Sequence, residues 1–237
     1  MKRFFLYSFL MFSLIFCSSH SQPKLEIVGG DNFDWGKVKP KENFISTKVK
    51  LKNIGNSKLI FGDIKPSCGC TTAPIDKKEL EPGDVATLDV TIKIQPGQVG
   101  GISKSITINS NDSTQTSKLL MLRADIVRDL VLTPGYTFVI PEMKVGSESG
   151  GNFKVKNNSD KPLDLTDFEV TPPTTSINTH GKVSLAPGQE IEVITKSKPT
   201  QKGSYNCKIT FKTTNPDYPN IEITGYGTVS ESPIFNN

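Results

Sequence analysis

Histidine is scarce in this 237-residue sequence: there are only two copies, and His180 is the only one beyond residue 20. A Ser-His-Asp triad would have to use His180, and a zinc site built on several histidines would lack ligands. The sequence also lacks a nucleophile elbow and a phosphate-cradling glycine loop. These absences argue against catalysis, and we predict a non-enzymatic protein that needs no cofactor.

Long hydrophobic runs are also absent once the first sixteen residues are passed. Residues 4–16 are apolar and follow Lys2 and Arg3, a layout typical of a secretory signal and too short to span a membrane comfortably. Small residues stand at the two positions that a signal peptidase recognises before Gln22. We therefore predict a signal peptide over residues 1–21 and no transmembrane segment in the mature chain.

A second interpretation of this leader makes Cys17 the lipidated first residue of a lipoprotein. It is less favoured, because Phe16 stands where a lipobox has a small residue. Either route exports the protein, and we expect it in the periplasm, at the cell surface or secreted.

An excess of one charge sign is missing as well. The formal net charge of the full sequence is +4, and removing Lys2 and Arg3 lowers it to +2. The lysines are dispersed, as at Lys48, Lys50 and Lys52, where alternate positions indicate a solvated sheet face. We predict no nucleic-acid partner.

One pattern occurs twice in the sequence. Three landmark pairs carry it, at separations of 104, 105 and 103 residues: Val49 and Phe153, Pro82 and Pro187, Ile106 and Ile209. A lag held so closely over a unit of this length indicates duplication of a whole domain, not a stacked short repeat. We predict domains at residues 22–128 and 129–237, joined by a short, partly apolar connector around residues 128–134.

Within each half the hydrophobic period is two. Leu88, Val90 and Ile92 alternate with polar residues, which is typical of a half-buried strand, and no amphipathic helix of useful length follows the leader. Short strands separated by turn signals predict an all-β fold of two tandem immunoglobulin-like antiparallel β-sandwiches. The usual inter-sheet disulfide is missing, and Cys207 is expected to be a buried thiol.

Cys68, Gly69, Cys70 and Thr71 form a motif that only the first half contains; the second has residues 172–175, Pro-Pro-Thr-Thr, in its place. An exported setting favours a disulfide that pins a loop, although a ring closed across one glycine departs from relaxed geometry. Two thiolates also suit Cu(I), but no other ligands lie nearby, so a metal is not favoured. Thiol exchange would need an exposed sulfur with a depressed pKa. These interpretations stay open.

The order of landmarks in the first half is similar to that of a known family of exported bacterial domains. The matching segments are Phe33-Asp34-Trp35-Gly36-Lys37-Val38, Lys52-Asn53-Ile54-Gly55, Leu59-Ile60-Phe61, Cys68-Gly69-Cys70-Thr71, Pro82-Gly83-Asp84 and Asn109-Ser110-Asn111. Over residues 26–128 the chain resembles domain-of-unknown-function family 1573. That family is related to the immunoglobulin-like domains of abnormal-spindle, hydin and major-sperm proteins. The resemblance implies a sandwich used in binding and assembly, and no activity.

Three functional hypotheses follow. The first is a non-enzymatic envelope module whose two domains bind another envelope protein through strand edges and end loops. The second is a periplasmic domain that handles copper or thiol redox chemistry at Cys68 and Cys70. The third is a pilus-type periplasmic chaperone, for which Leu120 and Leu122 offer a short donor strand between charged neighbours.

Overall fold

The structure is a computed structural model that describes residues 21–40 and 42–231. The predicted signal peptide, except for Ser21, and Cys17 lie outside the described residues. Within them, every regular element is a β-strand, which confirms the all-β prediction. The described part of the chain contains no helix with the length and apolar character that crossing a bilayer requires.

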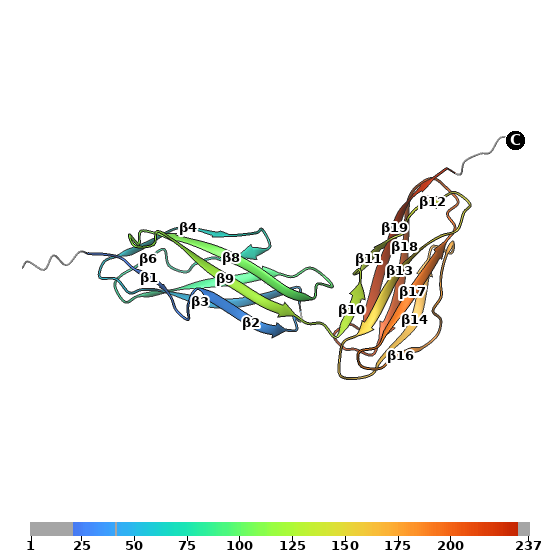
Figure 1. Ribbon diagram of the computed structural model, residues 1–237, viewed down its shortest axis with the longest axis horizontal. Helices are drawn as coiled ribbons and strands as arrows, with labels where there is room; N and C mark the ends of the chain where they lie inside the picture. The colour runs from blue at the N-terminus through green and yellow to red at the C-terminus, as the bar shows by residue number, and fades with distance from the viewer. Residues whose placement is uncertain (1–20, 41, 232–237) are drawn as a thin grey trace, which may run out of the picture.

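The first nine strands form one lobe, here called lobe 1 (Figure 1). They are β1 (Leu25–Ile27), β2 (Asn32–Val38), β3 (Phe44–Asn53), β4 (Leu59–Pro66), β5 (Thr71–Thr72), β6 (Glu79–Leu80), β7 (Val85–Lys93), β8 (Gly100–Ser110) and β9 (Ser117–Ile126). One of their two sheets has the strand order β1-β3-β7-β5, and the other has the order β2-β9-β8-β4-β6.

The remaining strands form lobe 2. They are β10 (Leu130–Thr133), β11 (Thr137–Val139), β12 (Met143–Lys144), β13 (Ser149–Asn157), β14 (Leu163–Thr171), β15 (Thr175–Ile177), β16 (Val183–Leu185), β17 (Glu190–Ser197), β18 (Gly203–Thr213) and β19 (Asn220–Ser230). Their orders are β10-β13-β17-β15 and β11-β19-β18-β14-β16, with β12 also paired to β19. Strand by strand, these orders repeat those of lobe 1, as the duplicated sequence pattern requires.

Each lobe encloses its own hydrophobic core. In lobe 1 the buried residues run from Leu25 to Ile126, and in lobe 2 they run from Leu130 to Val229, with no residue shared between the two clusters. The alternation in the sequence explains them: along β7, for example, Leu88, Val90 and Ile92 face inward and their neighbours face outward.

Two details of the sequence-based prediction were wrong. One sheet of each lobe is mixed and not purely antiparallel, because β2 runs parallel to β9, and β11 and β12 run parallel to β19, whereas the other sheet of each lobe is antiparallel throughout. The predicted connector is also shorter than expected. Leu130–Thr133 is strand β10 and pairs with β13, so its apolar residues belong to the core of lobe 2.

A buried asparagine occupies the same place in each lobe, and its side chain fastens a turn. Asn53 donates from Nδ2 to the carbonyl oxygens of Ser57 (2.8 Å) and Leu80 (3.0 Å). In lobe 2, Asn157 donates in the same way to the carbonyl oxygens of Lys161 and Leu185. Each buried amide thereby links the turn that follows its own strand to the last residue of a short neighbouring strand, β6 in lobe 1 and β16 in lobe 2.

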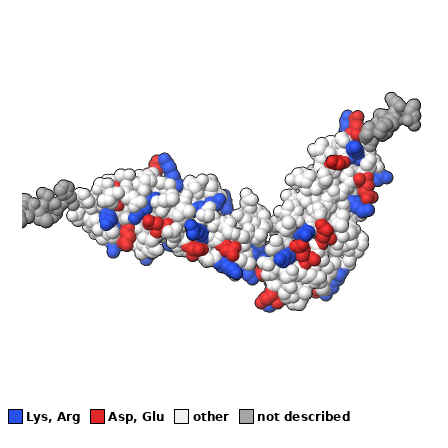
Figure 2. Space-filling view, in the orientation of Figure 1, with Lys and Arg blue, Asp and Glu red and all other residues white. Residues whose placement is uncertain are grey.

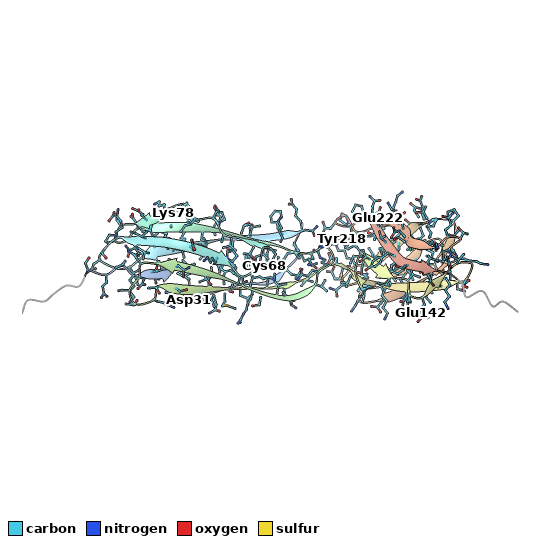
Figure 3. All side chains as sticks on the ribbon, turned by 90° about the horizontal axis from the view of Figure 1, so that it is seen from above. Asp31, Cys68, Lys78, Glu142, Tyr218 and Glu222 are labelled. Atoms are coloured by element: carbon cyan, nitrogen blue, oxygen red, sulfur yellow. A yellow bond between two sulfur atoms is a disulfide. The ribbon has the colours of Figure 1, made fainter. Side chains whose placement is uncertain are left out.

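The lobes lie end to end at an angle (Figure 1), and polar side chains meet at their junction. Arg128, only 5% exposed, donates from Nε to the carbonyl oxygen of Gln98 at 3.1 Å, and its guanidinium lies 3.5 Å from the Tyr218 hydroxyl of lobe 2. Asp129 forms an ion pair with Lys39 at 2.5 Å. Figure 3 shows Tyr218 where the lobes meet.

Candidate functional site

The Cys68–Cys70 loop joins β4 to β5, where the chain passes from one sheet of lobe 1 to the other. The two cysteines form a disulfide in the structure. The Ser67 N–H donates to the carbonyl oxygen of Ser105 on β8 at 2.8 Å, and the Cys70 carbonyl oxygen accepts from the N–H of Lys93, the last residue of β7, at 2.8 Å. The loop is therefore attached to both sheets. Figure 3 shows Cys68 in the half of lobe 1 nearer the junction.

Lobe 2 builds the same loop without sulfur. The Thr175 N–H donates to the Pro172 carbonyl oxygen at 2.9 Å, just as the Thr71 N–H donates to the Cys68 carbonyl oxygen at 3.2 Å. Thr71 and Thr175 are both buried. In lobe 2 the Tyr205 hydroxyl shares a hydrogen bond of 2.6 Å with the Thr175 hydroxyl, and this contact ties the loop down. The threonine thus belongs to the shared scaffold, whereas the disulfide is particular to lobe 1.

This geometry limits the chemistry of the loop. Sulfur atoms joined to each other are not thiolates, so both copper binding and thiol attack would require prior reduction. His180 lies in lobe 2, exposed between β15 and β16. Within residues 21–40 and 42–231, no three His, Cys, Asp or Glu side chains are grouped so that they could hold a metal ion. Cys207 is buried, as predicted, and burial raises the pKa of its thiol.

Beside this loop lies a sheet surface whose central side chains are uncharged, which we call the lobe-1 face. It is the outward side of β4, β8 and β9, and its residues are Ile60, Ser105, Thr107, Asn109, Leu119 and Met121. Lys65 of β4, the partner of Thr107 in the sheet, borders it and forms an ion pair with Asp63 at 3.0 Å. Leu119 is 47% exposed and Ile60 is 44% exposed, which is high for large aliphatic side chains. Ser105 also connects the face to the loop through its contact with Ser67.

The equivalent surface of lobe 2 is charged. The pairing of β18 with β19 places Lys208 and Glu222 where lobe 1 has Ser105 and Leu119. These two side chains form an ion pair at 3.1 Å. Lys212, at the position of lobe 1's Asn109, pairs with Asp167 on β14 at 3.0 Å. At these three positions the same scaffold carries paired charges in lobe 2 and uncharged side chains in lobe 1, where the Lys65–Asp63 ion pair lies at the border.

The free side of β4 and that of β14 are both protected against pairing with another strand. β6 covers only the first two residues of β4, and the β4 ladder is then interrupted by a bulge between Phe61 and Ile64. Asp63, Lys65 and Pro66 follow, and a bulge, charges and proline are the usual means of blocking an edge. β14 has the equivalent bulge between Thr166 and Glu169. These edges are poor sites for strand addition.

The donor strand considered for a pilus-type chaperone is not at an edge. Leu120 and Leu122 are fully buried in the core of lobe 1, and their strand β9 lies between β2 and β8. Nothing in this strand arrangement favours the chaperone hypothesis.

The fold defines the class: each lobe is an immunoglobulin-like β-sandwich. Residues 27–126 match the model of the family described as "Protein of unknown function (DUF1573)". The resemblance inferred from the cysteine motif and its flanking landmarks is thereby confirmed for lobe 1. No curated protein matches the chain.

Several solved structures are similar in fold. Alpha-2-macroglobulin of Escherichia coli, activated by porcine elastase, aligns with 89% of this chain and 22% of its own, at 11% identity and a TM-score of 0.50. A human PapD-like domain of CEP192 aligns with 44% of this chain and 87% of its own, at 10% identity and a TM-score of 0.38. A Porphyromonas gingivalis protein of unknown function aligns with 86% of this chain and 99% of its own, at 12% identity and a TM-score of 0.35. At such identities these likenesses concern the fold alone.

Sequence reasoning placed the cysteine loop correctly but missed the lobe-1 face. The sequence did contain a signal for it, because the two copies can be compared position by position at the lag of 103 to 105 residues. That comparison sets Ser105 against Lys208. The pairing of Leu119 with Glu222, however, also needs the register between neighbouring strands, which only the structure supplies.

Proposed function

We propose that the chain is a non-enzymatic, exported module of the bacterial envelope, in which domains 22–128 and 129–237 are two immunoglobulin-like units. In the proposal it lies in the periplasm or at the cell surface, and the lobe-1 face binds another envelope protein. The leader-like segment of the sequence supports export, and the fold of lobe 1 supports a binding role.

One observation carries the choice of surface: three charged positions of lobe 2, at Lys208, Glu222 and Lys212, are uncharged in lobe 1. The central parts of protein interfaces are depleted in charged residues, since burying an unpaired charge is costly. An exposed Leu119 in the middle of such a surface gains from being covered, at about 25 cal/mol per Å² of apolar area buried.

The cysteine loop has a supporting role in this proposal. We propose that the exported protein carries the Cys68–Cys70 disulfide, as the oxidising compartments outside the cytoplasm favour. The bond limits the freedom of a loop that is hydrogen-bonded to Ser105, one of the residues of the lobe-1 face. In lobe 2, Tyr205 supplies the same restraint by hydrogen bonding. The disulfide acts as a clasp, not as a reactive centre.

Site-specific photo-crosslinking in intact cells tests the surface. A benzophenone amino acid is placed at Thr107, on the lobe-1 face, and in a separate variant at Thr210, which occupies the equivalent position in lobe 2. We expect a defined protein adduct from position 107 and none from position 210. Equal adducts from both positions, or none from position 107, would contradict the proposal.

A further inference from the structure

A shallow hollow lies on the outward side of lobe 2, away from the lobe-1 face, where β11 and β18 flank β19. Its volume is about 530 Å³. The side chains that matter around it are Val139, Glu142, Ser204, Asn206, Tyr226 and Thr228. Its chemistry differs from that of every surface described above.

The floor of the hollow is an exposed aromatic residue with an aliphatic neighbour. Tyr226 is 46% exposed, and Val139, its partner in the parallel pairing of β11 and β19, is 56% exposed. On the other side Tyr226 faces Asn206 of β18. An apolar ring and a branched chain side by side on a sheet form a platform on which a flat apolar surface can stack.

The rim is polar and has unused hydrogen-bonding capacity. Within the described residues, no hydrogen bond or ion pair engages the side chains of Ser204, Asn206, Tyr226 or Thr228, or the Glu142 carboxylate. The Tyr205 hydroxyl, by contrast, is bonded inside the lobe. An amide, hydroxyls and a carboxylate around one ring offer both donors and acceptors to a ligand.

The backbone at the rim is unusual as well. Glu142 has a φ of 50°, in the left-handed region that non-glycine residues rarely adopt. Such strained conformations persist where the surrounding structure holds them, often at ligand sites. Glu142 directly precedes β12, and its carbonyl oxygen accepts a hydrogen bond from the Ser149 hydroxyl at 3.4 Å. Figure 3 shows Glu142 on lobe 2, beyond Tyr218 and away from the junction.

We propose that this hollow binds a neutral oligosaccharide. A pyranose ring presents an apolar C–H face, which suits Tyr226, and a rim of hydroxyls that need donors and acceptors like those of Asn206 and Glu142. The residues that line the hollow include the carboxylate of Glu142 and no Lys or Arg, which disfavours an anionic ligand. Its openness to solvent suits one or two rings of a longer chain.

Lobe 1 has no such site, and this gives an internal comparison. The pairing of β8 with β9 places Arg123 opposite Ser103, where lobe 2 has Tyr226 opposite Asn206. The aromatic platform and the amide are both missing there. The inference does not depend on the proposed protein-binding role of lobe 1, and either can fail alone.

The test is an NMR titration of the mature full chain with cellotetraose, maltotetraose and chitotetraose, read from backbone amide shifts. We expect saturable shifts with at least one of them, confined to residues around Val139, Asn206 and Tyr226, with a dissociation constant below about 10 mM. Tyr226→Ala should weaken binding by about tenfold or more, whereas Tyr226→Phe, which keeps the ring, should bind nearly as well. Phe44→Ala removes an exposed aromatic of lobe 1 and should change nothing.

Several results would overturn the inference. Among them are the absence of saturable shifts with all three sugars, binding that Tyr226→Ala leaves intact, and shifts located outside the hollow. Shifts at the hollow from a proline-rich peptide but from none of the sugars would assign the surface to a peptide instead.

Discussion

Asn53 and Asn157 are single residues on which a whole turn of each lobe depends. Both are fully buried, and each donates hydrogen bonds to two carbonyl oxygens. We expect Asn53→Ala and Asn157→Ala each to lower the free energy of unfolding by about 2–3 kcal/mol, because buried polar groups are left unsatisfied. Urea denaturation measures this, with the exposed Asn220→Ala as control. A loss no larger than the control's would contradict the assigned role.

Asp112 makes the stability of lobe 1 sensitive to acid. Burial alone would raise the pKa of this carboxyl, but hydrogen bonds from Thr114 and from the Leu25 and Gln115 N–H groups outweigh it and lower the pKa. A folded-state pKa below the unfolded value of about 3.9 gives stability that is present above that value and is lost as the pH falls through the folded one.

The corresponding variant is Asp112→Asn, which removes the ionisable group. At pH 7 it should be less stable than the parent by about 1–3 kcal/mol, and the difference should shrink as the pH falls below about 4. Chemical denaturation at a series of pH values measures this. An equal difference at pH 7 and pH 3 would show that the charge of Asp112 is not what stabilises this turn.

Among the elements, the β4–β5 loop of lobe 1 and the β14–β15 loop of lobe 2 are equivalent but are restrained differently. The first has the Cys68–Cys70 disulfide, and the second has the hydrogen bond between Thr175 and Tyr205. We expect Cys68→Ser with Cys70→Ser to lower stability by about 1–2 kcal/mol, the modest loss that a very short closed loop implies. Tyr205→Phe, which removes the hydrogen bond to Thr175, should cost about 1 kcal/mol in lobe 2.

Mass spectrometry of the unreduced, alkylated protein accompanies this comparison. It should find Cys68 and Cys70 unlabelled. Labelled cysteines, or a serine variant as stable as the parent, would contradict the clasp.

The strands themselves were largely predictable, and their directions were not. Alternation in β7 indicates which side chains are buried, but it is the same whether a neighbour runs parallel or antiparallel, so the parallel pairing of β2 with β9 had no sequence signal. Leu130–Thr133 was taken for a connector because four residues are too few to show a period. The cysteine loop was visible as a local motif, whereas the lobe-1 face joins β4, β8 and β9 and needs their register.

At the scale of the whole molecule, the two cores share no residue, so the lobes should fold separately. We expect fragments 22–128 and 129–237 each to unfold cooperatively in urea. The full chain should be only modestly more stable than its fragments, since the junction rests on polar contacts such as those of Arg128 with Tyr218 and of Lys39 with Asp129. A fragment that is unfolded in buffer would show that the domains depend on each other.

Charges of both signs are mixed on the surface of the molecule. On the side that Figure 2 shows, acidic and basic residues are interspersed over both lobes and do not form a field of one sign. For the proposed binding role, we therefore expect long-range steering by this side to be weak and selectivity to come from local contacts such as those of Leu119.

Exchanging the two faces tests the central claim most directly. Ser105→Lys with Leu119→Glu gives lobe 1 the pair that lobe 2 carries at Lys208 and Glu222, and the reciprocal variant, Lys208→Ser with Glu222→Leu, removes it from lobe 2. Capture of the crosslinked envelope partner is measured for both variants after confirming that each unfolds like the parent. We predict that the lobe-1 variant loses the partner and the lobe-2 variant keeps it. Capture that survives the lobe-1 exchange, or is lost only with the lobe-2 exchange, would contradict the account.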